Sequence, residues 1–110
     1  MNIILEICKR NNTKVLLVYV PTQNSWNKNK SELCVQYAEK NNLEFVDFNL
    51  KEVDWKNYYR DKGWHLNIYG AEIVTEELEK ELEKYKLVNH KNQKEYESWN
   101  ENYKLYKTLY

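Results

Sequence analysis

A ten-residue segment, Asp61–Gly70, gathers side chains that could carry out acid–base chemistry. It reads Asp-Lys-Gly-Trp-His-Leu-Asn-Ile-Tyr-Gly and holds both glycines and one of the two histidines of the chain. Histidine changes its charge near neutral pH and is the most common general base. A carboxylate in the same loop, at Asp61, can accept the Nδ1 proton of His65 and leave Nε2 to take a proton from a nucleophile. The alternative is an ordinary loop, in which an acid and a half-buried histidine cap backbone groups.

The wider pattern resembles the C-terminal block of the SGNH/GDSL hydrolases. That block consists here of Asp, then His-Leu-Asn, then Gly-Ala and an amphipathic helix. Upstream, KVLLVYVPTQNSW is similar to the late core strand and the loop after it, and YAEKNNLEFVDFN to the helix and strand before the block. The resemblance covers residues 1–85 and implies a serine hydrolase of O-acyl esters, including O-acylated carbohydrates of bacterial surfaces.

The resemblance also implies roles for single residues. His65 would be the catalytic base, and Asp61 would be the acid that orients it. Asn67 and Gly70 would be structural parts of the block, and Asn67 is also a good N-cap for the helix that follows.

Two departures from the family pattern concern the catalytic residues. The family usually places its acid three residues before the histidine, where this chain has Lys62. Asp61 lies one residue further back, so Asp54 and Asp47 are alternative candidates for the acid that orients His65.

The second departure is the nucleophile. The only serines are Ser25, Ser31 and Ser98, and none follows a strand in a Gly-Asp-Ser context. Acyl transfer needs a nucleophile, a base and oxyanion donors together. We therefore expect this chain to supply the His–Asp pair of an esterase and to be inactive alone. The alternatives are a non-catalytic α/β fragment and a small binding or self-association module that uses its Trp and Tyr side chains.

The expected elements follow from the spacing of apolar residues. They are a helix over 1–12, a strand over 14–20, a helix over 31–41, a strand over 43–48, an irregular segment over 49–63, a helix from 67 to 85, a connection over 88–94 and a tail helix over 96–110.

This order predicts an α/β fold, because strand–helix–strand implies a right-handed parallel crossover. We expect residues 1–86 to form part of a three-layer α/β/α domain of SGNH or flavodoxin type with parallel strands. The apolar run Lys14–Val20 indicates a strand covered on both faces. Two strands make a poor sheet, so we expect neighbours from a missing N-terminal segment or from a homodimer.

Residues 87–110 form the C-terminal connection and an aromatic-striped helix. Its aromatic residues recur at steps of three and four, which places them on one helical face; they are Tyr96, Trp99, Tyr103, Tyr106 and Tyr110. We expect this face to pack on the same α/β domain rather than to stack on sugars or bases.

Composition excludes several other classes of protein. The 17 Lys+Arg balance 17 Asp+Glu, and a neutral chain lacks the basic face that nucleic-acid binding requires. Two glycines exclude a glycine-rich phosphate loop, and Cys8 and Cys34 cannot form a zinc site alone. We expect both cysteines to be small buried apolar residues, and we expect no cofactor and no metal. No apolar run is long enough to span a membrane, and the compartment stays open.

Overall fold

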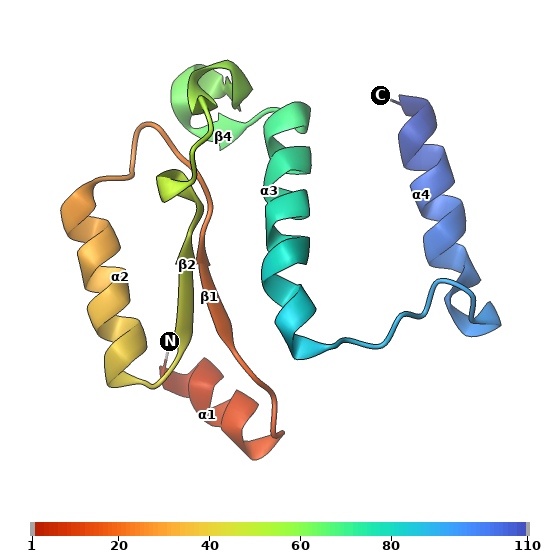
Figure 1. The fold of residues 1–110 in the computed structure, drawn as a ribbon, viewed down its shortest axis with the longest axis horizontal. Coiled ribbons are helices and arrows are strands. Elements are labelled where there is room, and N and C mark those ends of the chain that lie inside the picture. Colours follow the sequence, from red (N-terminus) through yellow and green to blue (C-terminus); the bar gives the residue numbers. More distant parts are fainter. Residues whose placement is uncertain (1, 110) are drawn as a thin grey trace. The chain divides into compact units, whose positions relative to one another are not determined.

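A computed structural model describes residues 2–109 and divides the chain into two compact units, one ending at Glu77 and one beginning at Leu78 (Figure 1). Met1 and Tyr110, which belong to the expected first helix and to the aromatic stripe, lie outside the described residues. The helices and strands are α1 (Asn2–Arg10), β1 (Leu16–Tyr19), α2 (Lys28–Lys40), β2 (Glu44–Asp47), β3 (Tyr59–Arg60), β4 (His65–Leu66), α3 (Ile68–Leu82) and α4 (Glu97–Leu109).

The centre of the first unit is a parallel strand pair. β1 and β2 run side by side in Figure 1, with Leu17 opposite Phe45 and Tyr19 opposite Asp47. α2 makes the connection between them and packs against β2. The predicted parallel strand–helix–strand unit is confirmed, and the fold is of mixed helix and strand type.

The structure corrects the expectation that the first strand is covered on both faces. Val18 on β1 is 37% exposed, and Val20 just after it is 48% exposed. In addition, β1 pairs with β2 alone in a two-stranded sheet, so each strand has one open edge within the described residues. The apolar run therefore predicted the strand correctly, but it did not predict how exposed the side chains of that strand are.

The segment after β2 is more ordered than the sequence indicated. Two short 3-10 turns, Phe48–Leu50 and Trp55–Tyr58, are followed by a narrow antiparallel ribbon of β3 and β4. In this ribbon Tyr59 lies opposite Leu66, and Arg60 lies opposite His65. Strands of two residues carry no readable alternation, so no pattern pointed to them.

The Asp47 carboxylate at the end of β2 is buried among polar partners. Its Oδ2 accepts hydrogen bonds from Ser31 Oγ at 2.6 Å and from Trp26 Nε1 at 2.8 Å. Its Oδ1 accepts hydrogen bonds from the backbone N–H of Asn49 at 2.9 Å and from Asn49 Nδ2 at 2.7 Å. These bonds join the first turn of α2, the loop before it and the turn after β2.

These partners decide the protonation state of Asp47. Burial raises the pKa of the carboxyl by desolvation, but the hydrogen bonds from Ser31, Trp26 and Asn49 outweigh that effect. The pKa therefore lies below its ordinary value of 3.8. A carboxyl whose pKa is depressed on folding stabilises the fold above its unfolded pKa, and this contribution is lost as the pH falls through the folded pKa.

The second unit holds the predicted tail helix, observed as α4. A 3-10 turn over Glu83–Tyr85 ends at Lys86, whose backbone is left-handed with φ of 50°. Trp99 and Tyr103 are exposed on α4. The packing of this helix on the α/β domain stays a prediction. Within the described residues, no helix combines the length and the apolar character needed to cross a membrane.

We predict that Ser31→Ala lowers the free energy of unfolding by about 1–3 kcal/mol at pH 7, because the buried, charged carboxylate of Asp47 loses one of its hydrogen-bond donors. The loss should be constant down to about pH 4 and should shrink at lower pH, where protonation removes the charge in both proteins. Urea unfolding between pH 7 and pH 3 measures it. Ser98→Ala on exposed α4 is the control. A loss that does not change with pH would show that Ser31 does not stabilise the carboxylate.

Candidate active site

Asp61 and His65 are in direct contact. His65 Nδ1 lies 2.8 Å from Asp61 Oδ2. An ionised carboxylate can only accept hydrogen bonds, so Nδ1 donates, and in the neutral ring Nε2 is then the acceptor. The side chains of His65 and Asp61 are 66% and 55% exposed. The predicted pair is therefore formed, and it is open to solvent.

The backbone of the turn explains how an acid four residues before the histidine reaches it. Asp61, Lys62 and Gly63 have φ angles of 51°, 56° and 94°, all in the left-handed region. Two of the three are not glycine, and such residues are uncommon there and occur often at functional sites. This left-handed turn brings Asp61 back toward His65. The contact therefore forms without an acid at position 62, where this chain has a lysine.

A second loop, over residues 21–26, holds this turn in place. The backbone N–H of Gln23 donates to Gly63 O at 3.1 Å, and Asn24 Nδ2 donates to Lys62 O at 2.7 Å. A Cβ on Gly63 would lie 2.9 Å from Gln23 Cβ, and the φ of 94° is itself unfavourable for a residue with a side chain, so glycine is required here. The loop after β1 is thus a positioning element that sequence reasoning missed.

Asn67 and Gly70 both lie at the start of α3 and shape how that helix begins. Asn67 Oδ1 accepts a hydrogen bond from the backbone N–H of Gly70 at 3.0 Å, which is the N-cap bond of α3. Asn67 Nδ2 also donates to Asn57 O at 3.1 Å. A Cβ on Gly70 would lie 2.7 Å from Tyr58 O, so glycine allows α3 to begin close to the turn before β3. These contacts fix the end of the segment that carries His65.

The other two candidate acids are engaged elsewhere. Asp54 caps the turn over Trp55–Tyr58 and accepts from the backbone N–H of Lys56 at 3.4 Å. Asp47 is held by the partners described above. Of the three candidates, Asp61 is the one that the structure brings to His65.

The three serines lie in different surroundings. Ser31 is buried on Asp47, and Ser98 is exposed on α4. Ser25 lines the same groove as His65, and its Oγ lies 3.2 Å from Thr22 Oγ1. Among the described residues, no serine is hydrogen-bonded to His65.

The groove beside His65 has a volume of about 580 Å³ and mixes polar with apolar walls. Arg60 is one of its polar residues, and its Nε lies 3.8 Å from Asp61 Oδ2. The full lining consists of Val20, Pro21, Thr22, Ser25, Arg60, Trp64, His65, Leu66, Ala71, Val74 and Thr75. A groove of this size can hold a small ester next to the histidine.

The two tryptophans near the site, Trp26 and Trp64, differ in burial and in hydrogen bonding. Trp26 is half-buried, and its Nε1 donates to Asp47. Trp64 lines the groove next to His65 and is 58% exposed. Trp26 is therefore structural, whereas Trp64 presents its ring to solvent.

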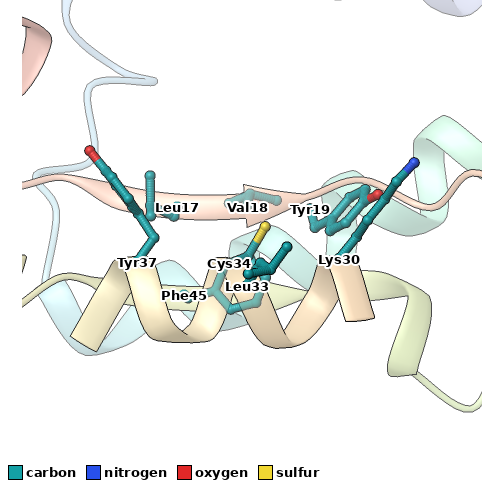
Figure 2. Close-up of a pocket in the computed structure, with 8 residues that line it drawn as sticks. All are labelled: Leu17, Val18, Tyr19, Lys30, Leu33, Cys34, Tyr37 and Phe45. Carbon is teal, nitrogen blue, oxygen red and sulfur yellow. The ribbon is translucent and has the colours of Figure 1, made fainter. Parts of the chain in front are cut away.

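A second groove, of about 620 Å³, lies between β1 and α2 and is lined almost entirely by apolar groups. Figure 2 shows Cys34 and Leu33 on α2 beside Val18 of β1, with Tyr37 and Lys30 at the two ends. The Tyr37 hydroxyl is buried without a hydrogen-bond partner among the described residues. This groove offers a surface for packing rather than a catalytic group.

Other candidate ligands are dispersed. Cys8 and Cys34 are free thiols and are half-buried, so they are less buried than expected. His90 lies in the second unit, where its Nδ1 is 2.8 Å from Gln93 Oε1 and its ring lies 4.4 Å from that of Tyr96, at a tilt of 36°. Within residues 2–109, no three His, Cys, Asp or Glu side chains gather as a metal site.

Comparison with known proteins gives no relative for this chain: no protein-family model, no curated protein and no solved structure matches it.

We predict that His65 is protonated at Nδ1 in its neutral form, because the Asp61 carboxylate selects that tautomer. Long-range ¹H–¹⁵N correlation spectra of the imidazole ring above pH 8 measure it. Asp61→Ala should allow the Nε2–H form to accumulate at His65 and should leave the spectrum of His90 unchanged. An Nε2–H tautomer in the unmodified chain would show that the contact does not form in solution.

Proposed function

We propose that this chain provides the histidine–aspartate half of a serine ester hydrolase of the SGNH type. His65 is the general base, and Asp61 orients it and stabilises the imidazolium. The observation that supports this proposal is the 2.8 Å contact between His65 Nδ1 and Asp61 Oδ2 beside a groove. The nucleophilic serine and the oxyanion donors belong to a segment outside these residues.

In the proposed reaction, the serine oxygen attacks the ester carbonyl carbon while His65 Nε2 takes the serine proton. The imidazolium then gives this proton to the departing alcohol, and an acyl-serine remains. Water, deprotonated by the same Nε2, releases the carboxylic acid and restores the serine. Asp61 keeps its charge throughout, because its part is to hold the tautomer and to offset the positive ring.

The open surfaces of the first unit are consistent with a missing segment. β1 has one open edge, and open edges attract another strand. The apolar groove of Figure 2 adds Leu33, which is 63% exposed, and Val18. We propose that the nucleophile-bearing segment covers this edge and completes a three-layer α/β/α domain. In its absence a second copy of the chain would take that place and give a homodimer.

We predict that the 110-residue chain hydrolyses p-nitrophenyl acetate no faster than buffer. The same chain extended by its upstream coding sequence, including a Gly-Asp-Ser segment, should hydrolyse the ester. His65→Ala should lower kcat of the extended protein by about 10²–10⁴-fold, and Asp61→Asn should lower it as well, since the base is lost or misoriented. His90→Ala is the matched control and should leave kcat unchanged.

Three results would contradict the proposal. An upstream sequence without Gly-Asp-Ser, or an extended protein that is active with His65→Ala, would favour a non-catalytic fragment or a small binding module. Hydrolysis by the 110-residue chain alone that disappears with His65→Ala would show that a hydroxyl within it, such as that of Ser25, is the nucleophile.

A further inference from the structure

We propose that the groove beside His65 binds a small ligand with a single negative charge, and that Arg60 receives its carboxylate. The ligand has a short uncharged body and one carboxylate end. This inference goes beyond the proposed function, because it concerns the charge of the ligand and applies equally to a hydrolase and to a binding module. It can be measured on this chain without any catalysis.

The first argument is the charge of the groove. Among the described residues that line it, Arg60 carries a permanent positive charge, and none is Asp or Glu. A wall with a cation and no acid is complementary to an anion. Several of the other lining residues are apolar, including Val20, Leu66 and Val74, and these suit many uncharged bodies. The selective group of the groove is therefore the Arg60 guanidinium.

The second argument is that the N–H groups of this guanidinium have no hydrogen-bond acceptor in the described part of the chain. Arg60 Nε lies 3.8 Å from Asp61 Oδ2, which is close enough for an ion pair but too far for a hydrogen bond. The same Oδ2 accepts the hydrogen bond from His65 Nδ1 at 2.8 Å. The Arg60 side chain is 66% exposed, so its donors are accessible to a ligand.

The Asp61 carboxylate limits the charge of the ligand. Its negative charge offsets part of the attraction between Arg60 and an anion, and it repels a dianion such as a phosphate monoester more strongly than a monoanion. A carboxylate carries one charge and accepts two parallel N–H bonds from a guanidinium. Recognition therefore depends on paired hydrogen bonds to a single carboxylate rather than on net charge.

The third argument concerns the length of the ligand. Arg60 and His65 lie opposite each other in the antiparallel β3–β4 ribbon, and both line the groove. Side chains of such a pair leave the ribbon on the same face, with Cβ atoms about 5 Å apart. A short molecule whose carboxylate binds Arg60 can therefore reach His65 with its other end.

The test is a ¹H–¹⁵N NMR titration of the 110-residue chain at pH 8 with monomethyl succinate and with methyl succinamate. These esters have nearly the same size, and the second carries a neutral amide in place of the carboxylate. Both should shift the backbone signal of His65. The carboxylate should bind about fivefold more tightly, as expected for a partly exposed ion pair. Added salt should reduce this difference.

Arg60→Gln should give the two esters equal affinities, because glutamine keeps N–H donors but has no charge. The variant should fold, since the Arg60 side chain is exposed. Arg10→Gln, at the exposed end of α1, is the matched control and should leave both affinities unchanged.

The inference is wrong if the amide binds as tightly as the carboxylate, if Arg60→Gln keeps the preference, or if neither compound shifts the His65 signal. A preference for the carboxylate together with an inactive extended protein would keep the binding site and refute the hydrolase. An active extended protein whose 110-residue part shows no such preference would do the reverse.

Discussion

The arrangement of the first unit depends on the Asp47 carboxylate. It lies at the end of β2, where it binds Ser31 of α2, Trp26 of the preceding loop and Asn49 of the following turn. A buried carboxylate is costly unless it is well hydrogen-bonded, and bonds to a charged acceptor are stronger than neutral ones. Few apolar side chains of the described residues are buried. The hydrogen bonds of Asp47, which we call the polar junction, therefore contribute much of what joins these elements.

The junction extends to the candidate site through one further contact. Asn49, held by Asp47, accepts through its Oδ1 a hydrogen bond from the backbone N–H of Thr22 at 2.9 Å. The loop that begins there donates from its next two residues, Gln23 and Asn24, to the turn that precedes His65. The position of His65 is therefore set by a series of directional polar bonds rather than by close packing alone.

The sequence predicted the local parts of this structure better than the long-range ones. The apolar run of β1 and the spacing in the following helix indicate a parallel unit, and an acid and a histidine in one loop are close in space by connectivity alone. The role of Asp47 was not predictable in this way. Its partners Ser31 and Trp26 lie 16 and 21 residues away, and a carboxylate after a strand is equally compatible with catalysis.

The exposure of β1 was not predictable for a related reason. An apolar run indicates that Val18 and its neighbours gain from burial, but it does not indicate how far the fold buries them. The β3–β4 ribbon was missed because its two-residue strands form through the backbone pairing of Arg60 with His65, and not through any side-chain pattern.

The left-handed turn at Asp61, Lys62 and Gly63 has a consequence for how a complete site would form. Its geometry is maintained by contacts within the first unit, from Gln23 and Asn24, so the histidine–aspartate pair does not need the nucleophile in order to assemble. In the hydrolase that we propose, a base that is already oriented would lower the cost of reaching the transition state. On the proposal of a serine hydrolase, the exposure of His65 would leave open the face that the nucleophile has to approach.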